Sequence, residues 1–351
     1  MALRLYTLFN DGAEDLRAKI AGIYGILFAF NVGAWIWAAF AFHAYPVLLG
    51  TALLAYSFGL RHAVDADHIA AIDNVTRKLM QEGKRPVAVG FMFSLGHSTV
   101  VVLGAAAIAG TAIALQHHFE TLRNVGSLVG TLVSALFLFA IAIVNMIVLR
   151  SIYRAFLRVR RGEPYVEEDF DMLLGNRGFL SRIFRPMFQM IRRSWHMYPL
   201  GFLFGLGFDT ATEIGLLAIS AAEASSGLSF CSILVFPVLF AAGMSLIDTT
   251  DNILMLAAYG WAFVKPIRKL YYNMTITCVS VIVALVVGGI EALGLLADHF
   301  HFKGRLWDGV ARLNDNFGML GYFIVGLFAL SWIVSIAVYK WRRFDDLDVK
   351  T

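Results

Sequence analysis

Long apolar segments alternate with short polar segments along almost the whole chain. An α-helix needs about 20 consecutive, mostly apolar residues to cross the hydrocarbon core of a membrane. Eight segments reach or exceed this length, at residues 20–42, 47–73, 87–115, 125–149, 197–222, 229–258, 273–297 and 317–340. The pattern therefore predicts an all-α, polytopic membrane protein with eight transmembrane helices.

The distribution of Lys and Arg predicts how these helices are oriented. The segments on the same side as the N-terminus hold 24 of the 29 basic residues, and the opposite loops hold four. Because basic residues gather in cytoplasmic loops, both termini are expected in the cytoplasm, as in a multi-pass protein of the bacterial cytoplasmic (inner) membrane. The whole chain, 1–351, is interpreted as a single transmembrane domain with a basic cytoplasmic loop at 150–196.

Composition supports a membrane protein and excludes several other classes. Only 15% of the residues are charged and the mean hydropathy is +0.69, whereas a soluble domain has about 25% charged residues. The net charge of +4 is carried by the loops, where basic residues face membrane lipid, and it does not indicate a nucleic-acid partner. The two cysteines, Cys231 and Cys278, lie in different apolar segments, so neither a disulfide framework nor a zinc–thiolate site is expected.

The second apolar segment contains histidines and aspartates at a depth where ionisable groups are costly. They are His62, Asp65, Asp67 and His68, and each costs roughly 2.5–3.5 kcal/mol unless it faces a partner, an ion or water. A salt-bridge network without an ion, with Arg61 as its cation, is one interpretation. Such a network needs no histidine, whereas imidazole combined with carboxylate suits divalent Ni, Co, Zn, Mn or Fe. We therefore expect this segment to handle a divalent transition-metal ion.

On a continuous α-helix these residues do not all share one face. At about 100° per residue, His62, Asp65 and His68 lie on one side and Asp67 lies on another. Arg61 precedes Asp65 by four residues, the spacing of an ion pair along a helix, so Asp65 either neutralises Arg61 or contacts the ion. His62, Asp67 and His68 reach one ion together only if the helix is locally distorted, or the ion passes between successive sets of ligands.

Other apolar segments also carry polar residues within the membrane. His97 lies between Gly96 and Ser98, and it is interpreted either as a metal ligand or as a hydrogen-bonding residue between closely packed helices. Two pairs of acidic residues are predicted to line the path of the ion, with a purely structural hydrogen-bonding role as the alternative. These acidic residues are Asp209, Glu213, Asp248 and Asp251.

Four motifs resemble those of the nickel/cobalt transporter (NiCoT) family of secondary permeases. They are Arg-His-Ala-Val-Asp-Ala-Asp-His-Ile at 61–69, Leu-Gly-His-Ser at 95–98, Leu-Gly-Phe-Asp-Thr-Ala-Thr-Glu at 206–213 and Asp-Thr-Thr-Asp at 248–251. The resemblance implies a single transport domain that imports Ni²⁺ with high affinity for metalloenzymes such as hydrogenase and urease. Ni²⁺ is then a transported substrate and no resident cofactor is expected. The resemblance also implies that His62, Asp67 and His68 are the central metal-handling residues.

The sequence leaves several alternatives to nickel import. Uptake of Co²⁺, or of both metals, fits the same ligand chemistry. An intramembrane metalloenzyme is a more remote alternative because the His-Glu-x-x-His motif is absent, and a metal sensor or a passive channel is another. The chain also lacks a Gly-x4-Gly-Lys-Ser/Thr phosphate-binding loop, so neither ATP hydrolysis nor an ATPase partner is indicated.

Overall fold

The structure, a computed structural model, describes residues 10–12, 15–110, 116–161, 191–206, 216, 219–220, 228–262, 266–315 and 317–341. Within these residues all regular secondary structure is helical, as the apolar pattern predicts. The elements are α2 (Leu16–Ala41), α3 (Pro46–His62), α4 (Ala66–Gln81), α5 (Val89–Gly110), α6 (Gln116–Arg160), the 3₁₀ helix η1 (Ser194–His196), α9 (Met197–Gly205), α11 (Phe230–Ile233), α12 (Val235–Ala262), α13 (Pro266–Phe300), α14 (Arg305–Asp315) and α15 (Phe317–Trp341).

Most of the predicted membrane-spanning segments are long apolar helices. Among the described residues, six helices are long and apolar enough to cross a membrane, and α3 and α4 form a seventh span if they are counted as one broken helix. The fifth predicted segment, 197–222, begins as α9, but most of its remainder lies outside the described residues. In the part of the chain that the structure describes, the predicted helical class with several apolar spans is thus confirmed, and the count of eight stays a prediction.

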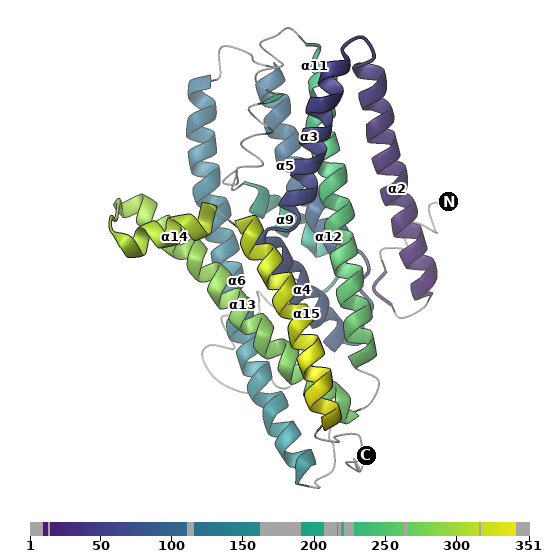
Figure 1. The fold of residues 1–351 in the computed structure, drawn as a ribbon, viewed down its shortest axis with the longest axis vertical. Coiled ribbons are helices and arrows are strands. Elements are labelled where there is room, and N and C mark those ends of the chain that lie inside the picture. The colour runs from purple at the N-terminus through teal and green to yellow at the C-terminus, as the bar shows by residue number, and fades with distance from the viewer. Residues whose placement is uncertain are drawn as a thin grey trace.

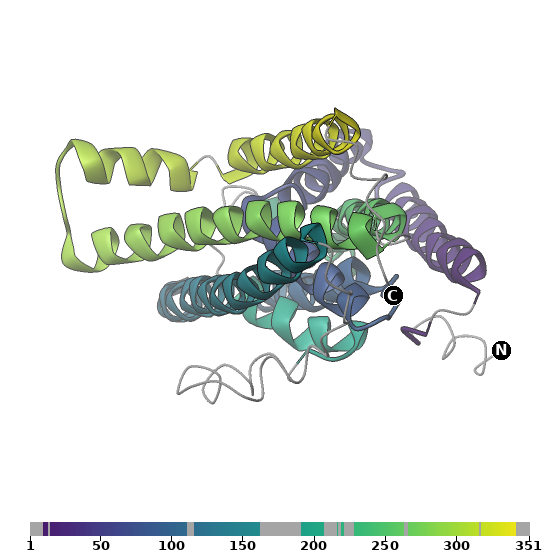
Figure 2. The same cartoon turned by 90° about the horizontal axis from the view of Figure 1, so that it is seen from below.

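The long helices form an elongated bundle (Figure 1). α2 begins toward the lower end of this view, whereas α3 starts at the upper end and leads downward into α4. α15 ends at the lower end, so the first and last long helices have their outer ends on the same side of the bundle. Figure 2 shows α13 extending to one side, with α14 folded back beside its far end. α14 connects the last two predicted spans.

The second predicted segment is not a continuous helix. α3 ends at His62 and α4 begins at Ala66, and the two helices are bent by 51° at this break. Asp65 has an extended backbone, with φ −67° and ψ 149°, and occupies the N-cap position of α4. The break also touches α15, where a Cβ on Gly321 would lie 1.5 Å from the carbonyl oxygen of Val64. The span is thus interrupted inside the motif that carries the predicted ligands.

Glycines allow the helices around this break to approach each other closely. A Cβ on Gly59 of α3 would lie 2.0 Å from the carbonyl oxygen of Phe240 on α12. On α5, a Cβ on Gly96 would lie 2.0 Å from the carbonyl oxygen of Tyr198 on α9. A larger residue at either position would force two backbones apart, and small residues commonly have this role where helices pack in membranes. α3 is therefore in close backbone contact with α12, and α5 with α9.

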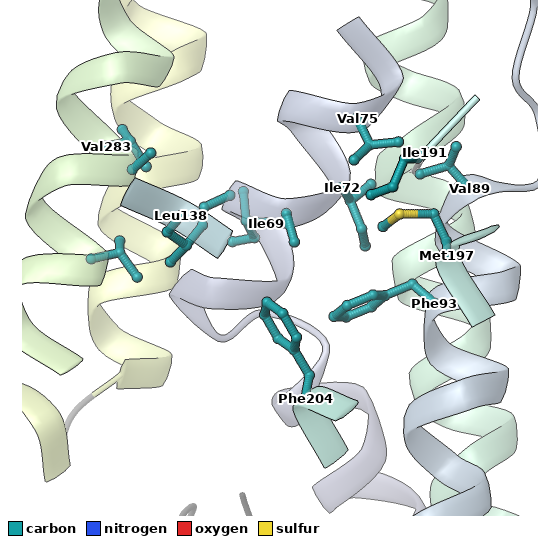
Figure 3. Packing of buried hydrophobic residues seen from close by; sticks show 14 of the residues in the cluster. Ile69, Ile72, Val75, Val89, Phe93, Leu138, Ile191, Met197, Phe204 and Val283 are labelled. Atoms are coloured by element: carbon teal, nitrogen blue, oxygen red, sulfur yellow. The ribbon is translucent and has the colours of Figure 1, made fainter. Parts of the chain in front are cut away.

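Apolar side chains from several helices fill the interior on the α4 side of the bundle. Figure 3 shows Ile69 and Ile72 of α4 between Leu138 of α6 and Phe93 of α5. Phe93 also packs edge-to-face on Phe204 of α9, with 5.3 Å between the ring centroids. Because tightly packed interiors resist displacement, this packing fixes the relative positions of the polar residues on α4 and α5.

A buried polar network connects the second half of α4 to α12 and α13. The carboxylate oxygens of Asp73 accept hydrogen bonds from the hydroxyl groups of Tyr259 and Ser280, the latter at 2.6 Å. Arg77 Nε lies 4.0 Å from Asp73 Oδ2, and Arg77 Nη1 donates to Thr277 Oγ1 at 3.0 Å. All five residues are buried, so these contacts replace the water that the two charges would otherwise need. The network anchors the second half of α4 to α12 and α13.

Replacing Ser280 with alanine should destabilise the protein by about 1–3 kcal/mol, because one oxygen of the buried Asp73 carboxylate loses its donor. The measurement is the midpoint of unfolding of the purified protein in mild detergent, titrated with SDS and followed by circular dichroism. Ser57→Ala is the control, since Ser57 is exposed and donates to the carbonyl of Leu53 on its own helix. Equal midpoints for the two variants would contradict a stabilising role of the Ser280 hydroxyl.

Candidate metal centre

Three histidines meet at the break in the second span. One ring nitrogen from each of His62, His68 and His97 lies within 4.8 Å of the corresponding atoms of the other two. His62 is the last residue of α3, His68 lies in the first turn of α4, and His97 lies on α5. On a continuous helix His62 and His68 would be about 120° apart, whereas their ring centroids are 4.7 Å apart across the break. The interruption of the helix thus brings the two rings together.

The histidine cluster is shielded from solvent. His62, His68 and His97 are only 1%, 0% and 3% exposed. The ring of Phe93 packs edge-to-face against His68 with 4.8 Å between centroids, and the ring of Phe240 lies 5.5 Å from that of His62. A metal ion bound among the three imidazoles would exchange much of its water for ring nitrogens.

Hydrogen bonding determines which nitrogen of His62 is available to a metal ion. Nδ1 of His62 lies 2.9 Å from Oδ2 of Asp65 and, because an ionised carboxylate only accepts, Nδ1 is the donor. In the neutral ring Nε2 then carries the lone pair, and it lies 3.0 Å from Nε2 of His97. With metal–nitrogen bonds of about 2.1 Å, two ligands at right angles lie about 3 Å apart. The observed separation therefore suits two neighbouring ligands of one ion.

His68 is held in the same way by a residue of a different helix. Its Nδ1 lies 3.3 Å and 3.2 Å from Oδ1 and Oδ2 of Asp248 on α12. Nδ1 is again the donor, so the lone pair of neutral His68 is on Nε2. Asp65 and Asp248 are both buried, and a carboxylate paired with the second ring nitrogen is the usual environment of metal-binding histidines.

Within the described residues, the three-histidine group includes none of the predicted acidic site residues. Asp67, which the family resemblance implies as a central ligand, lies in the first turn of α4 and is partly buried. Asp251 is partly buried on α12, one turn after Asp248, and its Oδ2 accepts no hydrogen bond within the described part of the chain. Asp209 and Glu213 lie outside the described residues. Metal contact by these acids stays a prediction.

Two features of the site did not follow from the sequence. Among the ion pairs of the described residues, Asp65 pairs with His62 and not with Arg61; the three-residue spacing of His62 and Asp65 was the available signal. Phe93 and Phe240 flank the cluster, yet no sequence pattern distinguishes them among the 29 phenylalanines of the chain.

Comparison with known protein families identifies a match over most of the chain. Residues 48–338 match the family model NicO, whose description is "High-affinity nickel-transport protein". The chain belongs to the NicO family. The matched region of this NicO protein begins near the start of α3 and includes all three histidines of the cluster.

Three curated relatives of this NicO protein are similar over most of their length. The chain is 66% identical over 334 residues to the "High-affinity nickel transport protein" of Cupriavidus necator, covering 95% of each chain. It is 51% identical to the "Hydrogenase nickel incorporation protein HupN" of Bradyrhizobium diazoefficiens, over 91% of this chain and 84% of that protein. It is 40% identical to the "Cobalt transport protein NhlF" of Rhodococcus rhodochrous, over 90% and 91% respectively. No solved structure matches the chain.

Proposed function

We propose that this protein is a high-affinity secondary transporter that imports Ni²⁺ across the bacterial cytoplasmic membrane, for the maturation of enzymes such as hydrogenase or urease. The observation that carries this proposal is the buried cluster of His62, His68 and His97 at the break in a membrane span. Imidazole nitrogens are suitable ligands for Ni²⁺. The printed names of the Cupriavidus and Bradyrhizobium relatives support the choice of nickel.

Charge balance around the cluster favours a divalent cation. Asp65 and Asp248 place two carboxylates against rings that must be neutral in order to bind metal. Buried charges are costly unless they are compensated. A doubly charged ion held by the ring nitrogens would compensate both carboxylates, whereas a monovalent ion would leave one negative charge in the interior.

The broken span supports transport by alternating access. In many transporters a discontinuous helix carries the substrate site, because the two half-helices reorient around it. α3 and α4 are such half-helices, and His62 and His68 lie on either side of their break. An interior-negative potential supplies roughly 2.3 kcal/mol per charge per 100 mV, or about 4.6 kcal/mol for Ni²⁺. This driving force allows uptake without ATP, and we infer a transporter rather than an enzyme.

The proposal includes the orientation of the chain in the membrane. Both termini and the basic loop at 150–196 are placed in the cytoplasm, and eight helices form the single transport domain 1–351, as the excess of Lys and Arg on one side predicts. Acids outside the histidine cluster are proposed to line the path of the ion. These acids are Asp67, Asp209, Glu213 and Asp251.

Co²⁺ is the second candidate substrate. The Rhodococcus relative is named a cobalt transport protein and is 40% identical to this chain. A cluster of three imidazoles accepts either ion, because Co²⁺ and Ni²⁺ are neighbours in ligand preference. Nickel is the better-supported substrate because the relatives named for nickel are the more similar ones.

The direct test is uptake by the purified protein in liposomes with an interior-negative potential. We expect radioactive Ni²⁺ to accumulate with saturation, and unlabelled Mg²⁺ not to compete because Mg²⁺ prefers oxygen ligands. Competition by Co²⁺ measures the preference between the two metals, and protein-free liposomes give the background. Uptake that rises linearly without saturation would indicate a channel, and uptake equal to the background would refute the proposed transport.

A further inference from the structure

Two buried carboxylates contact the histidine cluster without belonging to it. Asp65 lies 2.9 Å from Nδ1 of His62, and Asp248 lies 3.2 Å from Nδ1 of His68. Within the described residues, the group of atoms close enough to hold one ion consists of the three histidines and includes neither carboxylate. Nδ1 and Nε2 lie on different edges of an imidazole ring, so a carboxylate bound to Nδ1 is not beside the lone pair on Nε2.

We propose that Asp65 and Asp248 are positioning residues, which act on Ni²⁺ through His62 and His68 and are not its ligands. This inference rests on the function proposed above. Each carboxylate holds one ring in place, keeps the proton on Nδ1 and makes Nε2 a stronger donor to the metal. Both aspartates were predicted from the sequence as residues of the metal site, and this proposal assigns them a positioning role.

The environment of Asp65 indicates a role beyond capping a helix. An aspartate at an N-cap normally bonds the first-turn N–H groups, which stabilises the helix by about 1 kcal/mol. Asp65 occupies the N-cap of α4 but makes no such bond, and its Oδ2 accepts from His62 instead. Its Oδ1 is buried and accepts no hydrogen bond within the described residues. The side chain thus orients His62 in preference to stabilising α4.

Asp248 connects His68 to the packing of two other helices. The hydrogen bonds between His68 and Asp248 join α4 to α12 across 180 positions of the sequence. The backbone of Asp248 is itself held against α5, since a Cβ on Gly90 would lie 2.1 Å from its carbonyl oxygen. The position of the His68 ring therefore depends on where α12 packs, and not only on the local conformation of α4.

The test compares Asp248→Ala with Asp248→Asn, and Asp65→Ala with Asp65→Asn, in the purified full-length protein. We expect each alanine variant to bind Ni²⁺ about 10–100-fold more weakly in calorimetry. The asparagine variants should recover part of this loss, because the amide oxygen still accepts from Nδ1. X-ray absorption of the Ni²⁺-loaded alanine variants, at saturating metal, should show the same number of imidazole nitrogens as the wild type and no lost oxygen ligand.

The controls separate this inference from the proposed function. Asp298→Asn, at an exposed position of α13, should leave the affinity for Ni²⁺ unchanged. In the metal-free protein, ¹⁵N NMR of the histidine rings should show protonated Nδ1 for His62 and His68, and Asp248→Ala should alter the His68 signal alone. An oxygen ligand that disappears with Asp65 or Asp248, or an unchanged affinity in the alanine variants, would overturn the inference. Failure of the wild-type protein to bind Ni²⁺ would instead refute the proposed function. The two outcomes are distinguishable because this failure is seen in the wild type alone, without any variant.

Discussion

Nickel uptake is expected to be lost when His62 is replaced by alanine. The variant removes the ring whose Nε2 lies 3.0 Å from Nε2 of His97, so one of the three proposed ligands disappears from the cluster. It also leaves the carboxylate of Asp65 buried without the donor that it now has. The affinity for Ni²⁺ should therefore fall by more than the roughly 10–100-fold that follows loss of a hydrogen-bond partner of a ligand. Calorimetry and uptake of radioactive Ni²⁺ into proteoliposomes measure the two effects.

His43→Ala is the matched control for this variant. His43 is exposed and its Nδ1 lies 2.8 Å from the carbonyl oxygen of Phe40, away from the cluster. We expect it to transport Ni²⁺ at the wild-type rate. Both variants should elute as the wild type in size-exclusion chromatography, which shows that they are assembled. Wild-type uptake by His62→Ala would place the metal path elsewhere in the bundle.

The second large effect on uptake is expected from replacing a glycine that lies outside the histidine cluster. Gly59→Ala places a Cβ 2.0 Å from the carbonyl oxygen of Phe240, so the backbones of α3 and α12 must separate. Overpacking of this kind costs about 1–3 kcal/mol and occasionally more. The atoms that the new methyl group meets belong to the backbone of Phe240, so no flexible side chain can move aside. Because His62 is three residues further along α3, the displacement should also move the ring away from His97. We expect both reduced stability and severely reduced uptake.

Gly50→Ala tests whether this effect comes from helix packing. Gly50 lies on the same helix as Gly59, but a Cβ at Gly50 has no atom within 4 Å. Alanine should be neutral or more stable there, by up to about 1 kcal/mol, because it is a better helix former than glycine. Unfolding by SDS and uptake in proteoliposomes should be compared for the two variants. Similar behaviour of both would contradict the close contact between α3 and α12.

Much of the architecture follows from patterns that are local in the sequence. The length of an apolar segment is set by the thickness of the membrane core, so helices such as α2, α5 and α15 lie close to their predicted ranges. The choice of imidazole and carboxylate for a divalent transition metal also depends only on residue type. His62, His68 and His97 were all candidates on this basis, and the NicO family match agrees with the resemblance drawn from the four motifs.

The arrangement of the site depended on contacts that no local pattern contains. Helical periodicity placed His62 and His68 on the same side of a continuous helix but about 120° apart, whereas the break after α3 brings their ring centroids to 4.7 Å. The partner of His68 comes from α12, 180 positions away. Spacing alone equally allowed Asp65 to pair with Arg61 or with His62.

The sequence by itself therefore determined that this protein is a helical membrane protein with imidazole and carboxylate groups in its apolar segments, because apolar length and residue type are local properties of the chain. Only the tertiary structure decided that His62, His68 and His97 form the cluster. It also decided that Asp65 contacts Nδ1 of His62 and that Asp248 contacts Nδ1 of His68. The physical reason is that these contacts depend on where a helix breaks and on which backbone packs against the break, as the backbone at Gly321 packs against Val64.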